Sequence, residues 1–302
     1  MKLYNYGSIN IDHIYRVPHL VQPGETLAST DYQKVLGGKG ANQSIAVARA
    51  GAEVVHLGRY HAADQDMLRG MQEAGVDMSR LEAVDMPGGH AIIQVDDAAE
   101  NSIVLYAGAN HSFVPDELPV LLEGAQAGDW LLLQNECSCT AEMIGVVVAK
   151  GLKVAFNPAP MDEQVRALPL DKLSLLFVNQ LEVLQLLGAD TGTDPEADWL
   201  AEQLQAHFPE TAVVVTLGAR GVRYFYRGES IFVPAQKVTA VDTTGAGDTF
   251  TGYYLQAMLS GLPVEDCLRR ASLASALCVQ KAGASVSIPT AAEVDAFAES
   301  LV

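Results

Sequence analysis

Short apolar runs alternate with amphipathic segments through the second half of the chain, and this order predicts a strand–helix repeat. The runs at 130–133 and 213–215 lack polar alternation, which is typical of parallel strands covered on both faces. We expect strands at 129–134, 152–156, 174–178 and 212–217, and helices at 139–150, 180–187 and 195–207. A hairpin is expected at 222–233, and further helices at 247–260, 263–281 and 290–300.

The first third of the chain has a different pattern. Strands are expected at 2–7 and 54–58, and helices at 41–50 and 64–74. Residues 8–34 are polar and proline-containing, with only short β-like pieces such as 26–32. Two runs, 90–95 and 102–106, flank an acidic turn and predict a hairpin. We expect the hairpin and the 8–34 pieces to form a small antiparallel sheet outside the main fold.

These elements predict a doubly wound α/β fold with a mostly parallel sheet and a small β-sheet lid. The expected catalytic domain comprises residues 1–9, 36–87 and 108–302, and the expected lid comprises 10–35 and 88–107. Ligands of such sheets bind beyond the carboxyl ends of the strands. Polar clusters follow predicted strands at Asn10 and Asp12, Asn135-Glu136, Asn157, Asn179, 216–221 and 245–247.

Composition narrows the class of protein. The 302 residues are 49% hydrophobic and 19% charged, as in compact enzymes. A net charge of −18 argues against a nucleic-acid or anionic-membrane surface, because both need clustered Lys and Arg. The chain has no signal core and no apolar run of membrane-spanning length, and its four cysteines lack Cys-x-x-Cys spacing. We therefore expect reduced thiols and a cytoplasmic location.

The segment around Gly245-Ala246-Gly247 has the composition of an anion site. Its glycines let several N–H groups point at one place, and the helix that follows would add its N-terminal dipole. Asp248 stands where a general base for a hydroxyl belongs, although it is alternatively only a helix N-terminal acid. A dinucleotide fingerprint is not supported, because Phe250 occupies the last glycine's place. A Walker loop is not supported either, since Gly38-Lys39 is followed by glycine.

Other candidate motifs each have a structural alternative. Residues 37–42 allow a hydroxylated ligand to approach the backbone closely, or they form only a flexible hinge and a helix cap. Asp12 is a sugar ligand or a surface acid. In the segment from Asn179 to Glu182, the Asn orients phosphate or water and the Glu holds hydrated Mg²⁺, or the two residues only cap a helix. Residues 216–221 form a nucleotide-contacting turn or a hairpin turn. The spacing of Cys137-Ser138-Cys139 does not fit structural zinc, so buried or helix-start thiols are expected there.

Two signatures stand in a fixed order, Gly-Gly-Lys-Gly-Ala-Asn at 37–42 and Asp-Thr-Thr-Gly-Ala-Gly-Asp at 242–248. With Asn179 to Glu182 and Ala107-Gly108-Ala109-Asn110, they make the chain resemble the carbohydrate kinases of the PfkB family, and within it the ribokinases. The resemblance extends from residue 10 to residue 289. It implies a ribokinase-like fold and transfer of the ATP γ-phosphate to a primary hydroxyl of a pentose, first of all D-ribose, giving ribose 5-phosphate.

Alternative functions are open at this point. The same family includes kinases of nucleosides and of other sugars, and a non-catalytic sugar or nucleotide sensor on the same fold is a further possibility. A nicotinamide-dependent dehydrogenase would need the glycine fingerprint that the chain lacks.

The resemblance also implies roles for individual residues. Asp248 is the implied base, and the amides of Gly245, Ala246 and Gly247 form an anion hole. Implied sugar ligands are Asn10, Asp12, Gly38, Lys39, Gly40, Ala41, Asn42, Glu136 and Asp248. Implied nucleotide contacts are Asn179, Thr216, Leu217, Gly218, Ala219, Arg220, Gly221, Gly247, Asp248 and Ser272.

The resemblance further implies three cofactors, namely ATP, Mg²⁺ and a monovalent cation such as K⁺. Glu182 would place Mg²⁺ through water. The K⁺ loop maps to Asp242, Thr244, Cys278, Lys281, Gly283 and Ser287. The lid would mediate a homodimer. His90 stands where a small residue is expected, so its imidazole would narrow or re-pattern the sugar pocket; the alternative is a partly exposed strand histidine.

Overall fold

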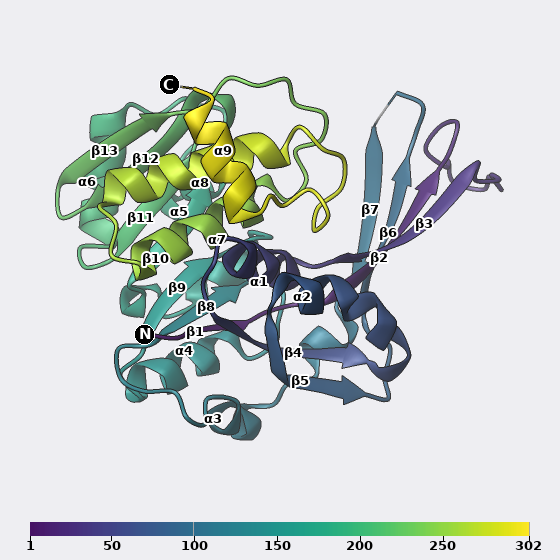
Figure 1. Ribbon diagram of the computed structural model, residues 1–302, viewed down its shortest axis with the longest axis horizontal. Helices are drawn as coiled ribbons and strands as arrows, with labels where there is room; N and C mark the ends of the chain where they lie inside the picture. Colours follow the sequence, from purple (N-terminus) through teal and green to yellow (C-terminus); the bar gives the residue numbers. More distant parts are fainter. Residues whose placement is uncertain (99, 302) are drawn as a thin grey trace.

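The computed structural model describes residues 1–98 and 100–301, and it confirms the predicted α/β class (Figure 1). A nine-stranded sheet forms its centre, in the order β13-β12-β11-β10-β9-β8-β1-β4-β5. The strands are β1 (Leu3–Tyr6), β4 (Val54–His61), β5 (Asp77–Val84), β8 (Trp130–Gln134), β9 (Lys153–Asn157), β10 (Leu175–Asn179), β11 (Ala212–Thr216), β12 (Gly221–Tyr226) and β13 (Glu229–Pro234).

The strand order places a topological switch point beside β1. Neighbouring strands pair in parallel from β11 to β5, whereas β12 and β13 form an antiparallel hairpin at one edge. From β1 the chain continues to β4 and β5 on one side, and later to β8 and its successors on the other. Ligands of doubly wound sheets bind where the order reverses, so the carboxyl ends of β1 and β8 are the expected site.

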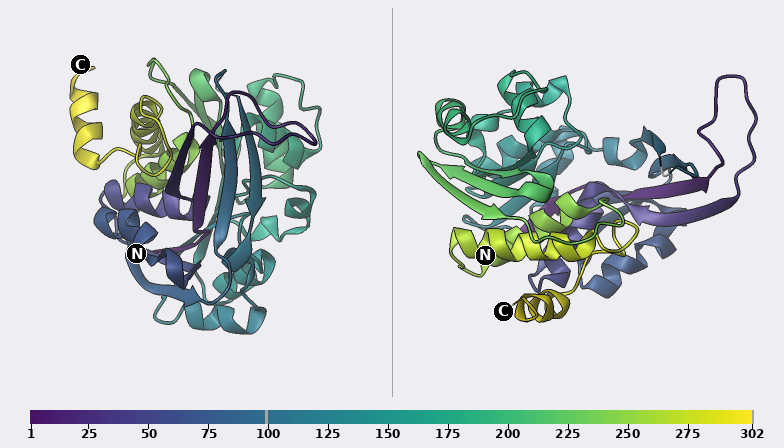
Figure 2. Two further views of the ribbon diagram at one scale, coloured as in Figure 1. Left: turned by 90° about the vertical axis from the view of Figure 1, so that its right-hand side faces the viewer. Right: turned by 90° about the horizontal axis from the view of Figure 1, so that it is seen from above.

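Helices cover both faces of the sheet, as Figure 2 shows from above. One face carries α1 (Lys39–Arg49), α2 (Arg69–Ala74), α7 (Ala246–Leu259), α8 (Val264–Cys278) and α9 (Ala291–Glu299). The other carries α3 (Leu118–Leu121), α4 (Thr140–Ala149), α5 (Gln180–Leu187) and α6 (Ala197–His207). Short 3-10 segments lie at 62–68, 108–111, 115–117, 163–167, 170–172 and 218–220.

The apolar central strands pack into both layers. Along β8, Leu132 faces α1 and α7, while Leu131 and Leu133 face the layer of α4 and α5, and none of the three is exposed. Each fully buried leucine contributes roughly 2 kcal/mol of apolar transfer free energy. This two-sided burial explains why the run has no polar alternation.

Helices α1 and α7 approach each other closely at Gly252. A Cβ added to this glycine would lie 2.4 Å from the Cβ of Ala46 and 2.7 Å from the backbone nitrogen of Val47. A larger residue would therefore push the two helices apart. The close contact matters for the site, because the N-terminal turns of both helices supply its side chains.

The lid is a second sheet that projects from the body (Figure 1). Its strands are β2 (Asn10–Arg16), β3 (Asp31–Gly37), β6 (Gly89–Val95) and β7 (Asn101–Tyr106), in the order β3-β2-β6-β7. The predicted hairpin at 90–106 is confirmed. The prediction of an antiparallel sheet is wrong in one pairing, because β2 and β6 run parallel. The chain makes a long crossover between them, and local patterns do not reveal such a pairing.

Three local predictions also need correction. The predicted β piece at 26–32 is wrong, since β3 begins only at Asp31. The predicted helix at 64–74 is divided into a 3-10 segment, Ala62–Leu68, and α2. Strand β5 was not predicted, because it is an edge strand with charged residues on its exposed positions. No helix within the described residues is both long and apolar enough to cross a membrane.

Candidate active site

The switch point collects the polar residues that the sequence singled out. Asn10 begins β2 just beyond β1, and Glu136 follows β8. Lys39 and Asn42 belong to the first turns of α1, with Gly38 at the N-cap. These residues surround Asp248, which lies in the first turn of α7 and is only 7% exposed.

The Asp248 carboxylate is held by side chains of α1. Asn42 donates from Nδ2 to Oδ2 at 3.0 Å, and Gln43 donates from Nε2 to Oδ1 at 2.9 Å. Burial raises the pKa of Asp248, while the charge of Lys39 and the two amide hydrogen bonds oppose that rise. A simple helix N-terminal acid would face solvent, so the buried and bridged carboxylate favours a chemical role.

Two further carboxylates lie near this site: Glu136, whose charge acts on Lys39, and Asp12, on which the charge of Glu136 acts. Glu136 Oε2 accepts hydrogen bonds from the Ser8 hydroxyl and, at 2.9 Å, from the backbone N–H of Lys39. Burial raises the pKa of Glu136, although Ser8 and Lys39 counteract it. Burial, and then the charge of Glu136, raise the pKa of Asp12 to about 6. Burial would lower the pKa of Lys39, but the charges of Asp248, Glu136 and Glu182 raise it above its usual range.

Asn110 fixes the orientation of Asn10. It donates from Nδ2 to Asn10 Oδ1 at 2.8 Å, and its own Oδ1 accepts from the Ile9 N–H at 3.0 Å. Since Asn10 Oδ1 is thus engaged, its Nδ2 remains as a donor for a ligand. Asn42 has the opposite orientation, because its Nδ2 is the atom engaged, in the hydrogen bond to Asp248. In the part of the chain that the structure describes, Asn42 Oδ1 is buried without a hydrogen-bond partner.

The hydrogen-bonding character of the pocket follows from these orientations. Carboxylates at Asp12, Glu136 and Asp248 accept, Asn42 Oδ1 accepts, and Asn10 Nδ2 donates. A ligand that satisfies this set must supply several O–H donors. The arrangement fits a small polyhydroxylated molecule.

His90 is a partly exposed strand residue, which confirms the alternative interpretation over an effect on the sugar pocket. His90 pairs with Ile11 in the lid sheet, whereas Asp12 pairs with Ala91. Successive residues of a strand point to opposite faces, so the His90 imidazole lies on the face away from Asp12. There it packs against other rings, with centroids 5.1 Å from Tyr106 and 6.0 Å from His13.

A cavity of about 570 Å³ lies at the N-terminus of α7, where Ala246 and Gly247 line it. Its walls are mainly apolar side chains and backbone. Expected nucleotide residues among its lining are Thr216, Gly218, Ala219, Gly221, Gly247 and Ser272. Lining residues that the sequence did not single out include Val222, Ala235, Gln236, Lys237, Val238, Phe250, Ser275, Ala276 and Val279. Residues 235–240 follow no periodic pattern, so the sequence held no signal for them.

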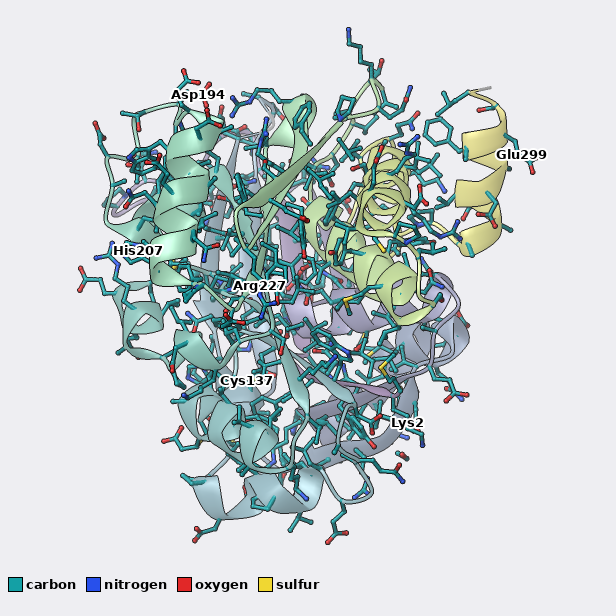
Figure 3. The ribbon with its side chains drawn as sticks, turned by 90° about the vertical axis from the view of Figure 1, so that its left-hand side faces the viewer. Lys2, Cys137, Asp194, His207, Arg227 and Glu299 are labelled. Carbon is teal, nitrogen blue, oxygen red and sulfur yellow. The ribbon has the colours of Figure 1, made fainter. Side chains whose placement is uncertain are left out.

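Leu217 and Arg220 face a separate cavity of about 310 Å³. Arg220 donates to both carboxylate oxygens of Asp194 at 2.8 Å, and also to Gln180. Asp194 lies on the surface near one end of α6, and His207 marks the other end (Figure 3). The Arg220 side chain thus ties the turn after β11 to the loop before α6.

The two predicted cation-loop segments meet at Asp242. Its Oδ2 accepts from the Gly283 N–H at 2.8 Å, and its Oδ1 accepts from the Thr244 N–H at 2.9 Å and hydroxyl at 2.6 Å. Cys278 Sγ lies 3.1 Å from Ser287 Oγ. The Lys281 ammonium pairs instead with Glu293 at 3.0 Å. Burial would raise the pKa of Asp242, but hydrogen bonds from Thr244 and Gly283 leave it below its usual value.

Asn179 and Glu182 form the predicted capping pair. Asn179 Oδ1 accepts from the Glu182 N–H at 2.9 Å, and Glu182 Oε2 accepts from the Asn179 N–H at 2.8 Å. The capping interpretation is therefore confirmed. Burial raises the pKa of Glu182, and the Asn179 N–H and the charge of Lys39 oppose the rise. Cys137 is buried and Cys139 stands at the N-cap of α4, as expected for thiols of this kind.

Two residues that organise the site, Gln43 and Asn110, carry no recognisable signal in the sequence. Gln43 was overlooked because it follows a glycine-rich motif inside a small-residue helix, and nothing local distinguishes it from a core position. Asn110 stood in a segment noted only for its resemblance, and it received no role. Both are buried and polar, which becomes informative only once burial is known.

Comparison with known proteins identifies relatives across the whole chain. Residues 2–291 match the model of the pfkB family carbohydrate kinase. A ribokinase of Haemophilus influenzae is 37% identical, over 97% of this chain and 97% of its own. A deoxyribokinase of Salmonella typhi is 29% identical, over 94% of each chain. The structure of Arabidopsis thaliana ribokinase complexed with ribose and ATP matches with a TM-score of 0.86 and 30% identity, over 98% of both chains.

The raised pKa of Asp12 predicts a pH-dependent change in stability. Folding favours its protonated form, so the charged form destabilises the ligand-free protein at neutral pH, by about 3 kcal/mol. Asp12→Asn should therefore increase the free energy of unfolding at pH 8. This gain should decline as the pH falls through 6 and vanish below about 4.

Urea unfolding of the ligand-free protein at several pH values measures the effect. Asp97→Asn, in the exposed turn of the lid, controls for the loss of one negative charge. An equal gain for Asp12→Asn at pH 4 and pH 8 would contradict the prediction.

Proposed function

This chain belongs to the pfkB family of carbohydrate kinases, phosphotransferases with an alcohol acceptor, and we propose that it transfers the γ-phosphate of ATP to the primary hydroxyl of D-ribose. The observation that carries the proposal is the position of Asp248. Its buried carboxylate is bonded to Asn42 of the polar cluster and lies in the first turn of α7, whose N-terminus lines a cavity of about 570 Å³. A kinase needs a base between its acceptor and its phosphate donor.

Asp248 is the proposed general base. It would accept the proton of the sugar hydroxyl as the oxygen attacks phosphorus, and burial, which raises its pKa, increases its affinity for that proton. Amides at Gly245, Ala246 and Gly247 begin α7, where the N–H groups of a first turn have no partner within the helix. In the ligand-free structure the Ala246 N–H donates to the Thr243 carbonyl oxygen at 3.2 Å, so it would have to exchange that bond for a phosphoryl oxygen. The three amides would stabilise charge on the phosphoryl oxygens, together with the Lys39 ammonium.

The choice of sugar follows from the acceptors in the pocket. Asp12 and Glu136 each need an O–H donor once water is displaced, and Asn42 Oδ1 is a buried acceptor without a partner among the described residues. A ligand that lacks one hydroxyl would leave one of them buried and unpaired, which costs about 1–3 kcal/mol. Relatives named ribokinase support ribose, and the Arabidopsis thaliana structure holds ribose with ATP. Deoxyribose is the main alternative, because one relative is a deoxyribokinase.

The residues present also fit the proposed cations. Asp242 already binds the two loops together, and loops of this kind offer the carboxylate and carbonyl oxygens that a hard cation prefers. Glu182 uses Oε2 for capping, so Oε1 remains to hold hydrated Mg²⁺. When bound, Mg²⁺ neutralises phosphate charge.

A homodimer through the lid is a further part of the proposal. The lid face that carries Asp12 continues outward into Ile103 and Leu105, which are 52% and 56% exposed. The opposite face exposes Val104 at 63% and Tyr106 at 49%. A projecting sheet cannot bury both faces against its own body, and exposed apolar surface of this kind marks an interaction site. The lid of a second copy presents the same apolar residues, including Ile103 and Leu105, and would cover this surface.

Asp248→Asn is expected to lower turnover by roughly 10²–10⁴-fold while ATP binding stays nearly unchanged, because it removes the base and keeps the shape. Asp266→Asn is the matched control. Asp266 occupies the same position in the first turn of α8 but is exposed. Steady-state kinetics and calorimetry of ATP binding measure both variants. Near-normal turnover of Asp248→Asn would remove this residue from the base role.

ADP release with a panel of sugars tests the acceptor. We expect kcat/KM for D-ribose to exceed that for 2-deoxy-D-ribose by about tenfold or more, because the missing hydroxyl leaves a buried acceptor unpaired. Nucleosides should react more slowly still. Each assay is run with K⁺ and with a bulky organic cation instead, and K⁺ should raise the rate. If the protein phosphorylates nucleosides but no sugar, the acceptor is a nucleoside and not ribose. If it phosphorylates none of these compounds, the kinase proposal is contradicted.

Ile103→Glu is expected to convert a dimer into a monomer, because it places charge on the exposed apolar face of the lid. Val148→Glu is the matched control, since Val148 is 40% exposed on α4, far along the chain from the lid strands. Light scattering after size exclusion gives the masses. A wild-type protein that is monomeric at micromolar concentration would exclude the lid dimer.

A further inference from the structure

A buried chain of polar side chains runs behind Asp248, across the middle of the fold. It begins at Gln43, which donates from Nε2 to Asp248 Oδ1 at 2.9 Å and to Asn157 Oδ1 at 3.0 Å. Gln134 donates from Nε2 to Gln43 Oε1 at 2.7 Å. Gln43 and Gln134 are 0% and 1% exposed, so solvent does not compete for these bonds. Every hydrogen-bonding atom of the Gln43 amide thus has a partner.

The chain continues from Gln134 to His56. Gln134 Nε2 also donates to Asn5 Oδ1 at 2.9 Å, and Asn5 Nδ2 donates to Ser44 Oγ at 2.8 Å. Ser44 Oγ lies 2.8 Å from His56 Nδ1, and His56 Nε2 lies 3.0 Å from the Gly7 carbonyl oxygen. Burial lowers the pKa of His56 to about 4, so the imidazole is neutral near pH 7. A neutral ring must donate from Nε2 to the carbonyl, and the Ser44 hydroxyl must then donate to Nδ1.

This sequence of donors determines the orientation of Gln43. If Gln43 were flipped, its oxygen would face the carboxylate of Asp248 and its nitrogen would face the Gln134 nitrogen. Asn157 adds a second restraint, because its own Nδ2 is held by the Phe177 carbonyl at 3.1 Å. The Gln43 amide is therefore locked by strands β8 and β9 with its N–H directed at the carboxylate.

We propose that Gln43 is a positioning residue for Asp248, holding the carboxylate in one orientation and in its charged form for proton abstraction. The proposal rests on the proposed role of Asp248 as base. Asn42 holds the other carboxylate oxygen at 3.0 Å, and Asn42 is also one of the proposed sugar ligands. Gln43 has no proposed contact with the sugar, since every hydrogen-bonding atom of its amide is bonded to another protein group. Its effect on the reaction passes through Asp248 alone.

The charged groups around Asp248 set the pH at which its carboxyl group loses its proton, and the pH dependence of the reaction rate reports that pH. Among the described residues, Lys39 of α1 favours the charged form of Asp248, whereas Glu136 beyond β8 disfavours it. The Gln43 hydrogen bond acts in the same direction as Lys39, because an N–H donor stabilises a carboxylate. Removal of that donor should raise the pH at which Asp248 becomes an effective base. A second carboxylate at position 43 should raise it further.

Gln43→Leu and Gln43→Glu test the proposal in single-turnover assays with D-ribose and ATP. Both should slow phosphoryl transfer on the order of a hundredfold, because a misplaced base loses its near-attack geometry. The KM for ATP should stay within about twofold. The acidic limb of the rate–pH profile should move to higher pH, and further in Gln43→Glu than in Gln43→Leu.

Ser44→Ala is the control for a merely structural role. It breaks the same buried chain between Asn5 and His56, at the end remote from Asp248. It should lower the melting temperature and leave the acidic limb in place. An unchanged limb in both Gln43 variants, or an equal shift in Ser44→Ala, would overturn the proposal. If Gln43→Leu does not fold, Gln43→Glu decides, since it keeps the side-chain size and the acceptor for Gln134.

Asp248→Asn, measured alongside, separates this inference from the proposed function. If Asp248→Asn keeps its activity, the base role itself fails. If Asp248→Asn is inactive and both Gln43 variants behave as wild type, only the role of Gln43 is wrong. Loss of rate in the Gln43 variants with a displaced acidic limb supports the positioning role.

Discussion

The burial of one carboxylate, that of Asp248, is the constraint on which the rest of the site depends. A charged group removed from water is tolerated only when hydrogen bonds and opposite charge compensate it. Asn42 and Gln43 supply the hydrogen bonds from α1, and Lys39 supplies the charge. These partners reach Asp248 because α1 and α7 touch closely at Gly252. The helix contact and the chemistry of the site are thus one structural requirement.

The topology of the sheet explains why distant parts of the chain meet at this point. Strands β1 and β8 are neighbours although more than a hundred residues lie between them, and the chain leaves them in opposite directions. The crevice at their carboxyl ends receives Asn10 from the lid, Glu136 from beyond β8 and the first turns of α1 and α7. The buried polar chain from Gln43 to His56 crosses the same strands, so it joins the site to the centre of the fold.

The pocket is built at a cost to the ligand-free protein. Asp248, Glu136 and Glu182 crowd around the Lys39 ammonium group, and burial raises the pKa of all three. Such crowding disfavours the charged forms in the absence of a ligand, and hydroxyl donors relieve it. The unpartnered Asn42 Oδ1 fits the same interpretation, since it is an acceptor that the described part of the chain leaves open. Function here is opposed to stability, as is common at binding sites.

The sequence by itself determined the α/β class and the positions of most helices and strands, because apolar periodicity and helix caps are local properties. It also predicted which strand ends carry polar clusters, and the structure brings Asn42 within 3.0 Å of Asp248 and Glu136 within 2.9 Å of the Lys39 N–H. Only the tertiary structure decided the parallel pairing of β2 with β6, which placed His90 on the face away from Asp12. It alone turned Arg220 toward Asp194 and locked Gln43 between β8 and β9. Each of these depends on a partner far along the chain, and local patterns do not specify which strands become neighbours or which side chains they bring together.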